Sequence, residues 1–304
     1  MNLTEYRHLQ SEQTFLTRQL AELPETAVLT RKSNEARLRS VENKLAASMS
    51  QNLRPASALL TFRGRPVVGS RGVFAEFGTK ATGLFTDAVN KVAAAFVGPL
   101  SQTGPIPNRD QSQLLITNIA VGSFGFELEE HCQNELPFGD DSPAKQALEL
   151  TRNLLQSTLG SDEELADSAS ATDPRAVDAV RAFVEVLATS EAVCALECGG
   201  KAFRFDDVGE VRKSLLRLSR DNLHESETKL HGEFQGVLPK SRTFEFRLSD
   251  SGEVIRGKVG PSIVEPDTLN AHLHQPTTIT VSEMRVGSGK PRYVLTVSPA
   301  WSGA

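Results

Sequence analysis

The strongest constraint on the fold lies in the last part of the chain, where apolar and polar side chains alternate in five short segments. These segments span residues 231–237, 243–248, 254–259, 277–284 and 293–298. Alternation with a period of two residues indicates β-strands that each bury one face. Five such strands in about seventy residues predict a small sheet or barrel.

A short helical segment at 266–274 separates the third predicted strand from the fourth. Five strands with a helix after the third is the element order of the OB-fold. In this order, residues 230–299 resemble an OB-like small β-barrel, and we assign residues 229–304 to it. A five-stranded barrel of another topology is the alternative.

Residues 1–50 predict a coiled-coil-like helical hairpin. Apolar side chains recur every three or four residues up to Leu23-Pro24, where a first helix should end, and a second helix follows. The two stripes comprise Tyr6, Leu9, Gln13, Leu16, Leu20 and Leu23, then Leu38, Val41 and Leu45, and the polar Gln13 weakens the first stripe. Stripes this narrow suit an antiparallel coiled coil. We therefore expect self-association or a protein partner at residues 1–50; the alternative is a hairpin folded back on its own domain.

Between the two lies a central mixed domain, residues 51–228, which makes the chain an α+β protein. Strands are predicted at 57–62, 113–121, 124–128, 193–198 and 201–205. Helices are predicted at 73–96, after Ser142-Pro143, after Asp173-Pro174 and after Asp207. The stretch near 160–172 holds four acidic residues and no basic one, and we interpret it as an acidic linker.

Composition limits the functional classes. With 304 residues the chain exceeds the size at which one core stops growing, which predicts several packed units. The formal net charge is −5, so nucleic acid could be bound only by a local basic patch. Three cysteines, no secretory signal and no apolar stretch of membrane-spanning length predict a cytoplasmic protein that does not enter a membrane.

A first candidate site is an anion-binding segment that contains Arg63, Arg65 and Arg71, interleaved with glycines. Guanidinium groups and glycine backbone amides can together hold a phosphate, and an enzyme acting on a phosphate-containing ligand is one hypothesis for this segment. The alternative is that these arginines pair with glutamates on a neighbouring strand, at positions 127, 129 and 130.

A second candidate site comprises the connections of the barrel. Lys240 and Arg242 lie in or beside the first connection, and Arg285, Lys290 and Arg292 surround the last one. Loops at these places flank the usual ligand face of an OB barrel, where cations could hold single-stranded nucleic acid. Protein binding by the same barrel and a purely structural role are the alternatives.

Catalytic and metal-binding motifs are weak, so no catalytic residue, metal or cofactor is predicted. Cys194 and Cys198 are too far apart on an extended strand to share one zinc ion, and His272 and His274 lack further ligands in the sequence.

Two segments carry a further resemblance: FRGRPVVGSRG at 62–72, and PNRD at 107–110 with SFGFELEE at 123–130. They are similar to uncharacterised bacterial proteins. Such families often belong to multi-gene systems, phage defence among them. We therefore expect a non-enzymatic binding or assembly subunit that associates through the hairpin and engages a protein partner with its barrel; nucleic-acid binding is the alternative.

Overall fold

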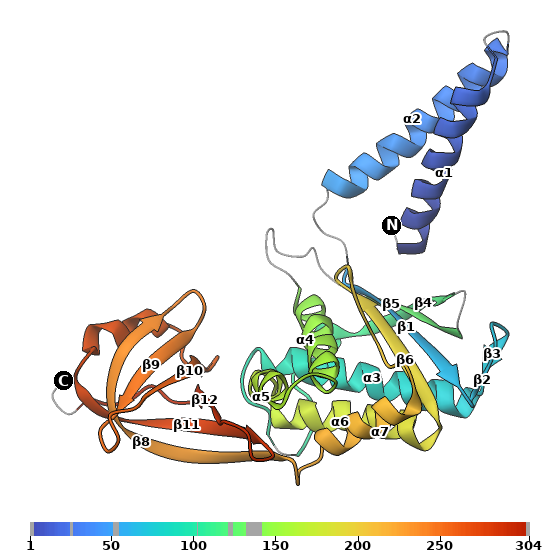
Figure 1. The fold of residues 1–304 in the computed structure, drawn as a ribbon. Coiled ribbons are helices and arrows are strands. Elements are labelled where there is room, and N and C mark those ends of the chain that lie inside the picture. The colour runs from blue at the N-terminus through green and yellow to red at the C-terminus, as the bar shows by residue number, and fades with distance from the viewer. Residues whose placement is uncertain are drawn as a thin grey trace.

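A computed structural model describes residues 3–24, 27–50, 55–101, 103–120, 124–131 and 142–301. Figure 1 shows three parts in chain order: a helical hairpin, a mixed central domain and a closed five-stranded barrel. This is the predicted α+β architecture. Gly122, Ser123 and the third cysteine, Cys132, lie outside the described ranges.

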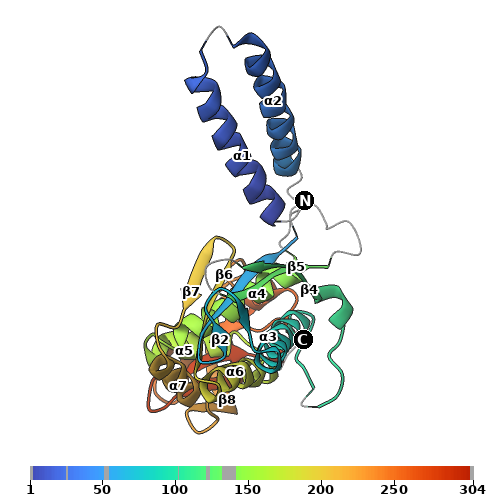
Figure 2. The ribbon, with the colours of Figure 1, turned by 90° about the vertical axis from the view of Figure 1, so that its right-hand side faces the viewer.

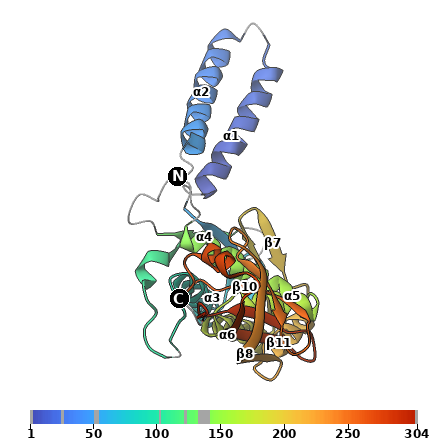
Figure 3. The same cartoon turned by 90° about the vertical axis from the view of Figure 1, so that its left-hand side faces the viewer.

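The N-terminal hairpin consists of helices α1 (Leu3–Glu22) and α2 (Val28–Ser50). Its seam buries Leu9, Leu16, Val41 and Leu45, and Leu38 packs against them. Asn34 donates a hydrogen bond to Gln19 across the hairpin at 3.1 Å. The predicted hairpin is therefore confirmed, and Figures 2 and 3 show it projecting from the rest of the molecule.

The central domain is built on one antiparallel sheet with the strand order β4-β5-β1-β6-β7. The strands are β1 (Ser57–Gly64), β4 (Leu114–Ala120), β5 (Phe124–Glu130), β6 (Ala192–Cys198) and β7 (Lys201–Arg204). A separate two-stranded ribbon pairs β2 (Val67–Val68) with β3 (Gly72–Val73).

A helical layer covers one face of this sheet (Figure 1). It contains α3 (Ala75–Ala95), α4 (Pro143–Ser157), α6 (Pro174–Thr189), α7 (Val208–Arg217) and the 3-10 turn η1 (Arg109–Ser112). Ser142, Asp173 and Asp207 accept backbone N–H bonds at the starts of α4, α6 and α7, as their sequence positions predicted. No helix in the described ranges combines the length and the apolar character needed to cross a membrane.

The structure differs from the prediction at the acidic stretch, which forms helix α5 (Asp162–Ser170) instead of a linker. Ser161 and Glu164 form a capping box, with N–H bonds of 3.2 and 2.8 Å. Leu165, Ala166 and Ala169 are buried. Asp162, Glu163 and Glu164 occupy the first helical turn, where their negative charges interact favourably with the positive end of the helix dipole. The sequence prediction rested on the acidic composition of this stretch and therefore missed the three apolar residues that α5 buries.

The C-terminal strands close into a barrel with the order β10-β12-β11-β8-β9. The elements are β8 (Leu223–Leu238), β9 (Thr243–Leu248), β10 (Val254–Val259), η2 (Pro266–His272), β11 (Pro276–Val286) and β12 (Arg292–Leu295). β10 and β12 pair in parallel, and η2 follows the third strand. This arrangement is consistent with the OB-like barrel that the element order predicted.

Buried aromatic rings fill the barrel. Phe234 contacts Phe244 and Phe246 edge to face, with ring centroids 5.8 and 5.1 Å apart. β8 and β11 extend beyond their predicted ends toward the central domain, and the domain boundary that we placed after residue 228 lies inside β8. Val286, near the end of this ribbon, belongs to the core of the central domain.

Candidate binding surfaces

The three arginines of the predicted anion segment are exposed but belong to different elements. Arg63 lies near the end of β1, and Arg65 lies in the turn after it. Arg71 lies in the tight turn between β2 and β3, where its N–H donates to Val68 O at 3.0 Å. The Arg65 guanidinium lies 3.6 Å from the Glu191 carboxylate. The segment therefore supplies exposed cations, one of them already paired.

The predicted alternative partners of these arginines lie on β5, the strand that pairs with β1. Glu127, Glu129 and Glu130 lie on β5 and are buried. The Glu130 carboxylate accepts bonds from the Ser142 hydroxyl at 2.7 Å and from the Ala56 N–H at 3.1 Å, so it fixes the start of α4. The acidic partner of Arg65 is Glu191, in the turn just before β6, which no local pattern around residues 127–130 could have indicated.

The two cations of the first barrel connection, Lys240 and Arg242, have different roles. Arg242 donates hydrogen bonds to the carbonyl oxygens of Val259 (3.2 Å), Gly260 (2.5 Å) and Ile263 (2.7 Å), and so closes the end of the barrel. Lys240 is exposed in the turn between β8 and β9. Of these two residues, only Lys240 has its charge available for a ligand.

The last barrel connection lies against the central domain. Gly287 donates its N–H to Asn222 O at 2.8 Å, and Arg292 pairs with Asp167 of α5 at 2.7 Å. Arg285 and Lys290 are exposed. The predicted group of five cations is therefore divided: two hold the fold together and three face solvent.

A cleft of about 710 Å³ lies where α5 meets the outer surface of the barrel. This volume is in the range of small-molecule sites. Its walls come from α5 and from strands β8, β9, β10 and β12, together with η2. The lining residues are Asp167, Ser170, Gly236, Val237, Leu238, Thr243, Phe244, Glu245, Arg256, Gly257, Lys258, Asn270, Arg292 and Tyr293.

The charged side chains of the cleft include one cation without a carboxylate partner. Arg256 pairs with Glu245 at 2.9 Å and Arg292 with Asp167 at 2.7 Å. Lys258 is exposed and forms no ion pair with the described residues. The cleft is therefore locally positive in a chain of net negative charge.

An apolar side chain and a tyrosine complete this cleft. Leu238 is 65% exposed. Tyr293 is partly buried, and burial together with the nearby carboxylates of Glu283 and Glu253 raises the pKa of its phenol. The hydroxyl is therefore a neutral hydrogen-bonding group at ordinary pH.

Sequence reasoning did not select Arg256 and Lys258, although a signal was present. They alternate along β10 with Ile255 and Val259, which are buried. Alternation places the two cations on the outer face of the barrel. The contribution of α5 could not be predicted, because that segment was interpreted as a linker.

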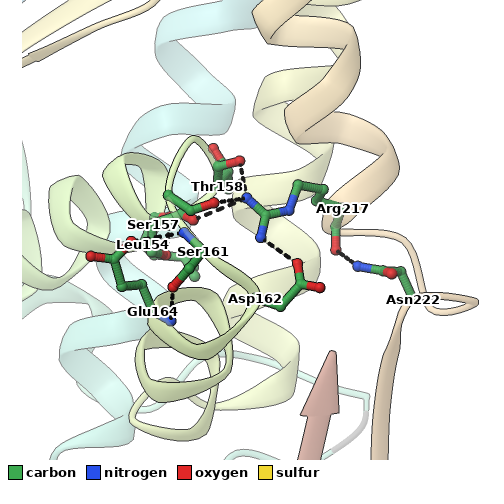
Figure 4. A network of polar contacts seen from close by, with 9 residues as sticks. Leu154, Ser157, Thr158, Ser161, Asp162, Glu164, Arg217 and Asn222 are labelled. Atoms are coloured by element: carbon green, nitrogen blue, oxygen red, sulfur yellow. Dashed lines mark hydrogen bonds and ion pairs between the residues drawn. The ribbon is translucent and has the colours of Figure 1, made fainter. Parts of the chain in front are cut away.

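A network around Arg217 holds α5 in place (Figure 4). The Arg217 side chain is only 12% exposed, and it pairs with Asp162 at 2.7 Å. It also donates to the carbonyl oxygens of Thr158 and Gly160, both at 2.7 Å. Arg217 thus joins the end of α4, the start of α5 and the end of α7.

Of the remaining candidate ligands, the two cysteines are buried and His272 contacts an aromatic ring. Cys194 and Cys198 are free thiols buried in β6, and burial raises the pKa of both, that of Cys198 to about 11. The His272 ring stacks on Trp301 with centroids 4.0 Å apart. No group of three or more His, Cys, Asp or Glu within the described ranges is arranged to hold a metal ion.

Comparison with known proteins adds no assignment to this geometry. No protein-family model, curated protein or solved structure matches the chain.

Proposed function

We propose that the chain is a non-enzymatic binding and assembly subunit of a bacterial multi-protein system, working in the cytoplasm and associating through its N-terminal hairpin. This proposal rests on one observation: the hairpin has its own small core and stands apart from the rest of the protein. α1 and α2 pack against each other and project from the body in all three views (Figures 1–3). The free thiols of Cys194 and Cys198 support a reducing compartment.

The hairpin buries little apolar surface of its own. Between helices of 20 and 23 residues, the seam buries four apolar side chains among those that the structure describes. Helices in proteins owe most of their stability to tertiary packing rather than to their intrinsic propensity. A second hairpin packed alongside would supply such contacts in a four-helix bundle.

Apolar side chains outside the seam offer the required surface. Phe15 is 61% exposed on α1, and Leu29 is 86% exposed at the start of α2. Isolated exposed apolar residues are common, but here they lie on an element with no other packing partner in the described chain.

The test is the mass of the full-length protein by light scattering. Phe15→Glu and Leu29→Glu place charges outside the seam, so they should lower the mass toward that of one chain, 33.0 kDa, without unfolding the hairpin. The matched controls Ser11→Glu and Ser33→Glu alter exposed positions on the same helices and should leave the mass unchanged. A hairpin variant with the mass of the parent protein would refute hairpin self-association.

A second candidate function is binding of single-stranded nucleic acid, which the unpaired Lys258 in the barrel cleft favours. Lys240 lies in the turn between Leu238 and Thr243, which both line the cleft. Phosphate contacts by these cations would make affinity fall with salt.

The corresponding test is titration of a fluorescent single-stranded oligonucleotide at several salt concentrations. Lys258→Gln and Lys240→Gln should each reduce the slope of log affinity against log salt by about one. Lys213→Gln, an exposed lysine on α7, is the control. Arg285→Gln and Lys290→Gln probe the other exposed connection; if they alone weaken binding, the cleft is not the site.

A further inference from the structure

We propose that the barrel cleft binds the end of a single-stranded nucleic acid and excludes the middle of a continuous strand, because α5 closes the cleft on one side. This inference rests on the second candidate function, nucleic-acid binding at the cleft, and names the part of the strand that is bound. The cleft follows a row of residues across the barrel. Gly257 of β10 pairs with Phe244 of β9 and with Tyr293 of β12, and all three line the cleft.

Helix α5 forms a wall at the β12 end of this row. β12 lies between β10 and β11 in the barrel, and α5 packs against β11 and β12. Asp167 of α5 lines the cleft and pairs with Arg292 of β12 at 2.7 Å. The start of α5 is held by the central domain, where Asp162 pairs with Arg217 at 2.7 Å. A strand that crosses β9 and β10 toward β12 therefore meets a helix fixed to both domains.

The opposite end of the cleft is open to solvent. It lies at the turn between β8 and β9, where Leu238 and Thr243 line the cleft. Leu238 is 65% exposed, and Lys240 is exposed in the same turn. A strand can therefore leave the cleft past Lys240, whose charge suits a phosphate backbone. One open end and one closed end give the cleft a direction.

The charges of the lining indicate where a phosphate would bind. Arg256 and Arg292 each pair with a carboxylate, whereas Lys258 forms no ion pair with the described residues. Lys258 lies on β10 beside β12, and neighbouring strands are about 4.8 Å apart, so the α5 wall begins roughly 5–10 Å beyond it. Successive phosphates of a stacked strand advance by about 3.4 Å. About one to three nucleotides therefore fit between Lys258 and the wall, which is the length of a strand end.

The test is a competition assay with the full-length parent protein and a fluorescent linear oligonucleotide. The two competitors are an unlabelled linear strand and a circular single strand of the same repeated sequence, which has no ends. We expect the circle to compete about tenfold less well per nucleotide, because its chain would have to turn away at the wall and lose contacts. Equal competition would overturn the end site and leave nucleic-acid binding in place, whereas no binding of either strand would refute both.

A third competitor separates a strand end from a free nucleotide, which carries the same phosphate. A nucleoside monophosphate should compete at least about tenfold less well than the linear strand, because it cannot also reach the open end of the cleft at Lys240. Equal competition by the monophosphate would overturn the strand end as the ligand. It would assign the cleft to free nucleotides instead.

Cross-linking tests whether the end lies against α5. Ser170 lines the cleft, whereas the equally half-buried Ser168 of the same helix does not. In a Cys132→Ser background, Ser170→Cys should couple about tenfold faster to an oligonucleotide with a thiol-reactive group on one of its terminal nucleotides than to one with that group at its centre. Ser168→Cys, the matched control, should couple to both at the same rate. Equal rates for Ser170→Cys with either terminal position and with the centre would overturn the proposal.

Discussion

At the scale of single residues, Arg217 has the clearest structural role. Its guanidinium group donates hydrogen bonds to three carbonyl oxygens and to one carboxylate, all between the end of α4 and the start of α5 (Figure 4). A planar group with five donors suits this arrangement, and the single ammonium of a lysine does not.

Arg217→Ala should lower the free energy of unfolding by about 2–3 kcal/mol, because buried acceptors lose a charged donor. Arg217→Lys should recover part of this loss. Arg220→Ala is the control: Arg220 forms an exposed pair with Asp178 at 2.6 Å, and its removal should leave stability almost unchanged because solvent screens an exposed ion pair. Urea denaturation measures all three, and equal losses for Arg217→Ala and Arg220→Ala would contradict the role of the network.

The buried thiols provide a second prediction at this scale. Burial raises the pKa of Cys194 and Cys198, so the folded state keeps both protonated at pH 8 and they should resist alkylation until the protein unfolds. Their contribution to stability is complete below the pKa of an unfolded cysteine, about 8.5, and is lost as the pH rises toward their folded pKa values. Mass spectrometry after iodoacetamide treatment of Cys132→Ser checks the protection; rapid labelling at pH 8 would contradict it.

At the scale of elements, α5 shows why a composition pattern can mislead. Four acidic residues without a basic one suggested a solvated linker, whereas Leu165, Ala166 and Ala169 form a small buried face. The start signal was present in Ser161 and Glu164, because their spacing matches a capping box.

Ser161→Ala should destabilise α5 and lower the free energy of unfolding by about 1 kcal/mol, since it removes the N-cap acceptor. Ser168→Ala, inside the same helix, should be neutral or slightly stabilising because alanine favours helix. The comparison is made by thermal unfolding. If Ser161→Ala were as stable as Ser168→Ala, the cap would not be holding the helix.

At the scale of the whole molecule, the hairpin and the body have separate cores, whereas the barrel and the central domain share contacts. Val286 of β11 joins the central core, and Arg292 of β12 pairs with Asp167 of α5. The hairpin cluster contains only residues of α1 and α2.

Deletion of residues 1–50 should therefore leave the main thermal transition of the body within about 3 °C of the parent value. Differential scanning calorimetry, with both proteins at equal chain concentration, measures this. A larger fall would mean that the hairpin, or the assembly it forms, contributes to the stability of the body.

The sequence by itself determined the kind and order of most elements, because strand alternation, helix spacing and caps are local properties. It therefore predicted the hairpin seam at Leu16 and Val41 and the five strands of the barrel. Only the tertiary structure decided which distant residues meet. Asp167 reaches Arg292, and Lys258 shares a cleft with α5. These outcomes depend on how whole elements pack and pair, which no short window of sequence contains.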